Sequence, residues 1–456
     1  MRSLRAFLGL VLVLSGLRSY ASTYYVSPDG NDSAAGTITR PFLSVQRAQQ
    51  AVTPGDTVYI RGGFYQMRPS QIALTRRIWA CVTALDKSGL PGRRIHYLAY
   101  PGERPVFDYS LIKPGNLRVI AFFVTGSYIH ISGIEVTGVQ VTIKTHTQSE
   151  CFENRGSHNI YENLKMHDGM AIGFYLVHGS DNLILNCDAY NNWDSVSEGG
   201  YGGNTDGFGC HPDSPASVNN VFRGCRAWFN SDDGFDCINA RAATTFDHCW
   251  SFCNGYSRGF IRRADGNGFK AGGYAARPAD ELPDPIPRNT VEFCLAVHNR
   301  SNGFYANHHL TGDNWYSNTA YRNAVNFNMV NRRTPGPADE LPRHGYNYAL
   351  DVPGYKHLMR NNLGFMGRRD TLNIDPVKSD IRYNSFTLPV TVSPDDFISQ
   401  DESQLTRPRA ADGSLPDITF LHLKKGSDLI DAGVNAGFPY KGSAPDLGCF
   451  ESPYHR

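Results

Sequence analysis

The 456-residue sequence has almost no net charge. Its 44 Lys and Arg residues balance 43 Asp and Glu residues, which gives a formal net charge of +1. Without Arg2, Arg5 and Arg18 of the leader predicted below, the 44 basic residues become 41 against 43 acidic ones, a balance near −2. This balance supplies no general attraction to nucleic acid or to anionic membranes. Affinity for a polyanion must therefore come from a local site.

The sequence also lacks a hydrophobic segment long enough for a membrane helix. Its apolar run, residues 6–17, is shorter than the ~20 residues that a bilayer span needs. The run follows two arginines and precedes Ser19-Tyr20-Ala21, a small-x-small cleavage site. No Cys follows it, so a lipoprotein anchor is not expected. We predict a signal peptide at residues 1–21 and a secreted or periplasmic protein.

A short phrase, Gly-Phe-x-small, recurs along the chain. It appears as Gly-Phe-x-x at five places and in degenerate form at a sixth, with the Phe at positions 174, 208, 235, 269, 304 and 327. A second phrase with Cys-x-Ala or a related triplet runs in step with it, from Cys187 to Asn318. Two phrases in fixed order with variable spacers indicate coils of about 24 residues, which stack one residue type above another. The pattern predicts an all-β, parallel β-helix fold.

Strand alternation assigns each repeated residue to a face. The six Phe residues should point inward and stack. Cys187, Cys225, Cys249 and Cys294 share one register and should form an inward column of free thiols, because buried Cys packs as a small hydrophobe. Pairing among the other Cys residues is left open.

The remaining organisation follows from the breaks in the repeat. An amphipathic stretch, residues 43–52, is expected to form a helix that caps the open end of the coil. Residues 22–456 are predicted to form a single catalytic β-helix domain, with residues from about 395 to 456 packing back on the coil. Long loop insertions are predicted at 190–204, 254–266, 272–289 and 331–346.

The outward face carries the chemistry. The residues that follow the repeated Phe include Asp236 and Lys270, which should be neighbours on adjacent rungs ~4.8 Å apart. Asp206, Asp232 and Asp233 precede the repeated Gly residues and should converge on the same place. Four close carboxylates repel one another unless some are protonated or a cation binds. Their hard oxygen ligands favour Ca²⁺, and the absence of His and Cys from this cluster disfavours zinc.

A calcium ion beside a lysine is suited to β-elimination on a uronic acid. The C5 proton lies next to a carboxylate, and a cation on that carboxylate stabilises the charge that develops when the proton leaves. Lys270 is the candidate base if its amine is neutral, and a salt bridge to Asp236 is the alternative role. As a base, Lys270 would act on an acidic polysaccharide.

These motifs resemble those of the family nine polysaccharide lyases. The resemblance is carried by Asn-Thr-Asp206-Gly-Phe, by Asn-Ser-Asp232-Asp233-Gly-Phe-Asp236 and by Gly-Asn-Gly-Phe-Lys270-Ala-Gly-Gly, within residues 160–330. It implies a right-handed parallel β-helix, a pectate or rhamnogalacturonan lyase activity, calcium held by the four aspartates, and Lys270 as the Brønsted base.

The substrate contacts are predicted from residue type alone. A groove for galacturonate needs cations for carboxylates and aromatic rings for sugar faces. Such residues in the motif-bearing coils are His211, Arg258, Arg263, Arg300, Tyr305 and His308.

Three alternatives stay open at this stage. The pectin backbone cleaved is either polygalacturonate or rhamnogalacturonan I, because both present the same C5 proton. A glycoside hydrolase on the same coil would use two of the carboxyl groups as acid and base. A non-catalytic polysaccharide-binding β-helix would need no calcium and lysine together. The protein is expected to act as a monomer.

Overall fold

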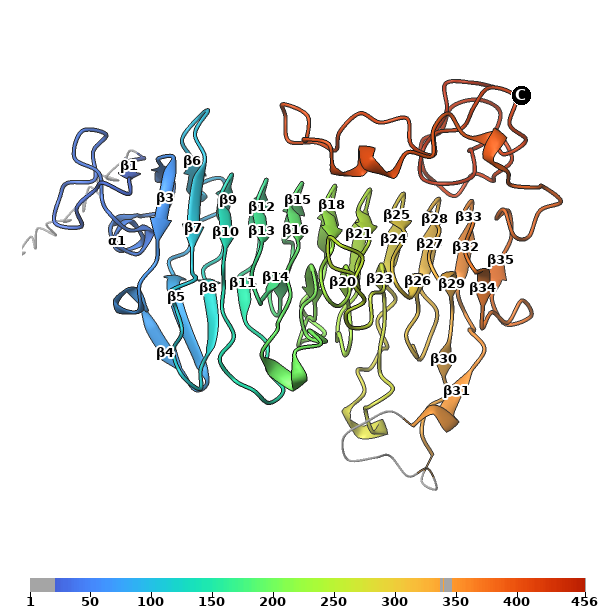
Figure 1. Cartoon of the computed structure of the whole chain (residues 1–456), viewed down its shortest axis with the longest axis horizontal. Helices are drawn as coiled ribbons and strands as arrows, with labels where there is room; N and C mark the ends of the chain where they lie inside the picture. Colours follow the sequence, from blue (N-terminus) through green and yellow to red (C-terminus); the bar gives the residue numbers. More distant parts are fainter. Residues whose placement is uncertain (1–20, 337–338, 340–346, 456) are drawn as a thin grey trace, which may run out of the picture.

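The computed structural model describes residues 21–336, 339 and 347–455. The chain winds into one elongated coil whose successive turns stack along the long axis of the molecule (Figure 1). Three parallel sheets of 12, 10 and 11 strands form its sides. Each sheet takes one strand from almost every turn, so strands far apart in sequence pair side by side. The prediction of a right-handed parallel β-helix is confirmed.

The strands of each sheet follow in chain order. The first sheet contains β1 (Thr23–Val26), β2 (Thr57–Ile60), β6 (Ile95–Ala99), β9 (Ile129–Ser132), β12 (Ile160–Glu162), β15 (Leu183–Leu185), β18 (Asn220–Arg223), β21 (Thr244–Asp247), β24 (Thr290–Glu292), β27 (Asn314–Tyr316), β32 (Leu358–Arg360) and β35 (Asp380–Ile381). The second sheet contains β3 (Gly63–Gln66), β7 (Pro105–Asp108), β10 (Glu135–Thr137), β13 (Lys165–His167), β16 (Asp188–Tyr190), β19 (Arg226–Trp228), β22 (Trp250–Phe252), β25 (Leu295–Val297), β28 (Thr319–Tyr321) and β33 (Leu363–Phe365).

The third sheet carries the repeated Gly-Phe phrase. It contains β4 (Leu74–Arg76), β5 (Trp79–Leu85), β8 (Arg118–Val124), β11 (Glu150–Asn154), β14 (Ile172–Leu176), β17 (Phe208–Cys210), β20 (Phe235–Asp236), β23 (Phe269–Lys270), β26 (Asn302–Tyr305), β29 (Val325–Asn328) and β34 (Arg369–Leu372). A separate antiparallel pair joins β30 (Asn331–Arg332) to β31 (Asp351–Val352).

The described residues contain one α-helix, α1 (Val45–Ala51), at the N-terminal end of the coil (Figure 1). Ser44 accepts a hydrogen bond from the amide of Arg47 and so caps the first turn. The buried side chains of Val45 and Ala48 face the core, which fits the predicted capping role. Short 3₁₀ turns complete the structure: η1 (Pro69–Gln71), η2 (Ser197–Gly199), η3 (Ala279–Glu281), η4 (Tyr348–Leu350), η5 (Pro394–Asp396) and η6 (Glu402–Thr406). No described helix is long and apolar enough to cross a membrane.

The core follows the predicted register. Each of the six repeated Phe residues is at most 1 % exposed. The rings of Phe208, Phe235 and Phe269 stack with centroids 4.8 Å apart and nearly parallel planes. The four Cys residues of the predicted inward column are fully buried, and all ten Cys of the chain are free thiols.

Buried asparagines hold the corner between the second and third sheets. The side-chain amide of Asn230 donates to Oδ1 of Asn254, and the side-chain amide of Asn254 donates to Oδ1 of Asn299. Both hydrogen bonds are 3.1 Å long. The same amide of Asn254 also donates to the carbonyl of Ala227 at 3.0 Å. The backbone at this corner leaves buried N–H and C=O groups that water cannot reach. This asparagine ladder supplies their hydrogen-bond partners. It also fixes the segments that lead into the third sheet.

The C-terminal segment loses the repeat and lies along the second sheet (Figure 1). Phe397, Leu405 and Phe420 are buried in one apolar cluster with Trp250 and Leu295 of the sheet. The segment therefore covers that face of the coil and leaves the third sheet open.

Candidate active site

The site stands on the outward face of the third sheet. Parallel pairing aligns Gly209 with Asp236, Asp236 with Lys270, and Lys270 with Tyr305. Because strand side chains alternate, the inward stack of Phe residues directs each of these neighbours outward. The predicted pairing of Asp236 and Lys270 on consecutive rungs is confirmed.

Lys270 lies among carboxylates. Its Nζ is 3.1 Å from Oδ2 of Asp236 and 3.0 Å from Oδ2 of Asp233, and the residue is only 7 % exposed. Burial alone lowers the pKa of this amine, but the surrounding carboxylates, Asp233 foremost, outweigh burial and raise the pKa well above its usual range. Without a bound cation the amine is therefore protonated and ion-paired.

Three aspartates form a buried triad. Asp206, Asp233 and Asp236 each place a carboxylate oxygen within 4.8 Å of the others. Oδ1 of each accepts a backbone hydrogen bond: from the amide of Asp233 at 3.1 Å, of Asn267 at 2.6 Å and of Ile238 at 2.7 Å, respectively. The second oxygens of Asp233 and Asp236 are the ones that face the amine of Lys270.

The fourth predicted ligand, Asp232, lines the same cavity without joining the triad. Its Oδ1 accepts a hydrogen bond from the amide of Asp265 at 3.1 Å. Burial, and then repulsion from Asp233 and Asp206, raises the pKa of Asp232 well above its usual value. Asp265 is a further acidic residue of the cavity that motif reasoning missed.

The triad fits a divalent cation. Burial and mutual repulsion raise the pKa of Asp206 well above its usual value and that of Asp233 to about 6. Oδ2 of Asp233 is buried and has no hydrogen-bond partner among the described residues, because Lys270 approaches it outside hydrogen-bond geometry. Buried, crowded oxygen ligands of this kind are stabilised when a hard cation neutralises them. The buried triad can thus hold a metal ion.

Asp206 and Asp236 of the triad line a cavity of about 730 Å³ together with Lys270. Loops that lead into strands of the third sheet supply one wall, which includes Asn204 and Asp265. Loops that leave those strands supply the other wall. The second wall carries Arg241, Tyr274 and Arg277. Arg241 donates to the carbonyl of Glu281 at 3.1 Å, and Arg277 pairs with the carboxylate of Glu281 at 2.7 Å. These contacts hold two guanidinium groups at the rim of the site.

His211 also lines the cavity, as predicted for a substrate contact. Its Nδ1 lies 3.0 Å from the hydroxyl of Tyr175, and its Nε2 lies 4.0 Å from Oδ1 of Asp236. The ring of Tyr175 covers Gly209, where any Cβ would lie 2.3 Å from it. Glycine at this rung therefore makes room for Tyr175 beside the triad.

The other predicted substrate residues lie elsewhere. Tyr305 follows Lys270 on the next rung, with its hydroxyl 3.3 Å from Nε2 of His308, and neither is among the residues that line the cavity. Arg258 lies 3.5 Å from Asp168, and the guanidinium of Arg300 donates to backbone carbonyls. Arg263 stacks on Trp193 at the edge of a different cavity.

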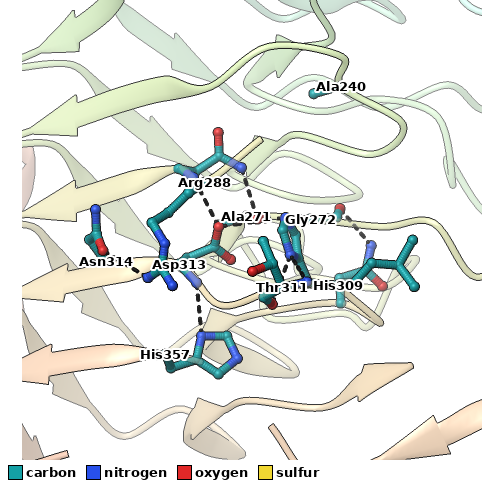
Figure 2. Close-up of polar contacts among 12 residues, drawn as sticks. Ala240, Ala271, Gly272, Arg288, His309, Thr311, Asp313, Asn314 and His357 are labelled. Atoms are coloured by element: carbon teal, nitrogen blue, oxygen red, sulfur yellow. Dashed lines mark hydrogen bonds and ion pairs between the residues drawn. The ribbon is translucent and has the colours of Figure 1, made fainter. Parts of the chain in front are cut away.

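A buried polar cluster holds the backbone that follows Lys270 (Figure 2). The carbonyl of Ala271 accepts a hydrogen bond from the side chain of Asn289 at 3.0 Å, and the amide of Asn289 donates to Oδ1 of Asp313 at 2.9 Å. The amide of Asp313 donates to Nδ1 of His357 at 3.0 Å (Figure 2). Burial raises the pKa of Asp313 well above its usual value and lowers that of nearby His309 to about 4. The hydrogen bonds of this cluster support the backbone that follows Lys270.

Sequence reasoning missed Arg241, Arg277 and Tyr274. Arg277 and Tyr274 lie in the predicted 272–289 insertion, which extends from the same side of the coil as the segment around β30 and β31 (Figure 1). The length of that insertion was the available signal, since long loops on a rigid scaffold commonly carry binding residues. No repeat marked which of its residues would face the site.

Comparison with known proteins agrees with this geometry. Residues 24–347 match the family model described as "Pel9A-like, right handed beta helix region". Pectate lyase L of Dickeya chrysanthemi is 34 % identical over 450 residues, which cover 96 % of this chain and 93 % of the relative. A solved rhamnogalacturonan lyase is 46 % identical, with a TM-score of 0.83 over 89 % of this chain and 97 % of its own. Solved pectate lyase Pel9A is 30 % identical, with a TM-score of 0.72 over 95 % of this chain and 97 % of its own.

Proposed function

Because the chain belongs to the Pel9A-like β-helix family and is a pectate or rhamnogalacturonan lyase, we propose that it cleaves the galacturonate bonds of rhamnogalacturonan I by calcium-dependent β-elimination. Support for this polymer comes from the 46 % identity to a rhamnogalacturonan lyase, against 34 % and 30 % to two pectate lyases. Polygalacturonate is the second candidate, since its galacturonate units present the same reacting atoms.

The observation that carries the mechanism is the contact of Lys270 with Asp233 and Asp236 inside an open cavity. β-Elimination requires a base at C5 and positive charge beside the C6 carboxylate. In the proposal, Asp206, Asp232, Asp233 and Asp236 hold Ca²⁺. When bound, the ion neutralises the substrate carboxylate and the negative charge that builds on it as the C5 proton departs.

Lys270 is the proposed base. Its amine emerges beside the triad, where the C5 proton of a bound galacturonate would lie. The four carboxylates hold a proton on this amine as long as their charge is uncompensated. If a bound cation neutralised these carboxylates, they would no longer stabilise the protonated amine. Burial would then favour the neutral form of Lys270. The neutral amine then accepts the C5 proton, and the C4 glycosidic oxygen leaves.

Arg241 and Arg277 are the proposed contacts for a further substrate carboxylate. Both line the cavity, where the backbone carbonyl of Glu281 holds Arg241 and the carboxylate of Glu281 holds Arg277. A planar guanidinium binds a carboxylate through two parallel hydrogen bonds. The pair therefore favours a polymer with more than one uronate. Such a polymer belongs to plant cell walls, and the predicted leader is in keeping with an exported enzyme.

Product analysis tests the proposal. Purified protein is incubated with rhamnogalacturonan I and with polygalacturonate, with and without a chelator, and unsaturated product is followed by its ultraviolet absorbance. We expect faster release from rhamnogalacturonan I, none with chelator, and recovery when calcium is added. Saturated reducing ends without ultraviolet absorbance would identify hydrolysis and overturn the proposal.

A further inference from the structure

A second cavity of about 280 Å³ lies on the other face of the two loops that frame the active site. Loops 190–204 and 254–266 turn Asn204 and Asp265 towards the catalytic cavity. The same loops turn Trp193, Tyr256 and Arg263 towards the second cavity. The two cavities therefore share a wall but have separate linings.

Arg263 is poised for an anion. Its guanidinium carbon lies 3.5 Å from the centroid of the Trp193 ring, and its Nε is buried without a hydrogen-bond partner among the described residues. Two nearby arginines are engaged: Arg258 of the same loop pairs with Asp168 at 3.5 Å, and Arg300, which follows β25, donates to the carbonyl of Ala264 at 2.6 Å. A buried donor without a partner is costly, and a ligand carboxylate would satisfy it.

The stacked pair is held in place before any ligand arrives. The indole nitrogen of Trp193 donates to the carbonyl of Gly200 at 2.8 Å, and the amide of Arg263 donates to the carbonyl of Gly255 at 2.8 Å. Trp193 is still 36 % exposed, so its ring offers apolar surface for a sugar. Ligand binding therefore costs little side-chain conformational entropy at these two residues.

The rest of the lining suits an acidic sugar. Gln140, Ser195 and Ser257 supply amide and hydroxyl groups that can bond to sugar hydroxyls. The acidic residue of the cavity, Asp168, would repel a carboxylate if its charge were bare. It lies 2.6 Å from Nδ1 of His167 and 3.5 Å from Arg258, so its charge is matched.

We propose that this second cavity binds a uronate unit of the acidic polysaccharide, outside the catalytic cavity, with the carboxylate on Arg263 and the sugar beside Trp193. The identity of the ligand rests on the proposed function, whereas the need for an anionic sugar rests on Arg263 itself. The volume, smaller than the 730 Å³ of the catalytic cavity, suits a short stretch of chain.

Calorimetry tests the site in the Lys270→Ala background with a chelator present, so that neither cleavage nor calcium contributes. Oligogalacturonate is titrated into this protein and into versions that also carry Arg263→Gln, Trp193→Ala or Arg262→Gln. We expect each of the first two to weaken binding about tenfold: Arg263→Gln loses a charge-assisted contact, and Trp193→Ala loses the ring surface beside the sugar. Arg262→Gln, the matched control at an exposed arginine of the same loop outside the cavity lining, should change the dissociation constant less than twofold. Thermal melting verifies that each variant is folded.

Two results would overturn the site: oligogalacturonate binding that is unchanged by Arg263→Gln, or a neutral galactan oligosaccharide that binds equally well and with the same dependence on Arg263. Kinetics with otherwise wild-type protein then locate the bound chain. If Arg263→Gln raises KM for the polymer but not for a trisaccharide, one chain spans both cavities. If wild-type protein cleaves neither polymer, the proposed function fails, while Arg263-dependent binding still supports the site.

Discussion

Lys270 and Asp236 are paired residues of β23 and β20, and the lysine amine lies 3.1 Å from Oδ2 of the aspartate. The pair lies one rung from Gly209, whose missing side chain makes room for Tyr175. The Lys270 ammonium group therefore lies beside the candidate metal ligands, and its attraction to their carboxylates stabilises the protein without metal.

Lys270→Ala should lower the rate of unsaturated-product release about 10²- to 10⁴-fold, the usual contribution of a general base. Lys270→Arg should be similarly impaired, because a guanidinium stays protonated. The exposed Lys424→Met serves as the matched control and should retain activity. Full activity of Lys270→Ala would refute the assignment of the base.

Asp233→Asn should weaken calcium binding at least about tenfold, because the triad loses a charged ligand. The measurement is calcium titration by calorimetry on chelator-treated protein. Asp395→Asn, an exposed change far along the chain, should leave the affinity as it was. Equal calcium affinity in Asp233→Asn and wild type would count against the triad as the metal site.

Arg277→Ala and Arg241→Ala should each raise KM for rhamnogalacturonan I about tenfold through loss of a carboxylate contact, with a smaller effect on kcat. Steady-state kinetics on the polymer check this, with exposed Arg40→Ala as control. A loss in kcat alone would instead place these residues in the chemical step.

Asn254→Ala should lower the free energy of unfolding by about 2–4 kcal/mol. The change removes the partners of several buried groups, including the amide of Asn230 and the carbonyl of Ala227. Denaturant unfolding measures the difference, and exposed Asn435→Ala should change it by less than about 0.5 kcal/mol. Equal effects of the two changes would mean that the ladder adds little stability.

Glu292→Gln should stabilise the protein at alkaline pH. Burial first, and then Asp247 on the neighbouring rung, raises the pKa of Glu292 from 4.5 to about 7. Between these values the folded protein keeps a proton that the unfolded chain loses, so stability falls as pH rises through this window. The variant lacks this loss.

Melting temperatures of wild type and Glu292→Gln across pH provide the measurement. The advantage of the variant should be absent below about pH 4.5, grow towards pH 7 and stay constant above it. A difference that does not vary with pH would show that Glu292 titrates normally in the folded protein.

The repeated phrases determined most of the fold and the centre of the site. A parallel coil places equivalent residues ~4.8 Å apart, so the register of the Phe residues alone was enough to align Asp236 with Lys270 and to bring Asp206 and Asp233 to the same place. The buried thiol column followed from the same register.

Tertiary structure alone decided which loop residues meet. Arg263 stacks on Trp193 from an insertion 70 positions later in the chain, and Arg277 enters the catalytic cavity from an insertion without a repeat. An insertion has no rung to align it, so its side chains are positioned by contacts between segments distant in sequence. The sequence by itself therefore determined the stacked scaffold and its ionic centre, because backbone pairing is periodic. The walls of both cavities depended on packing that no local pattern encodes.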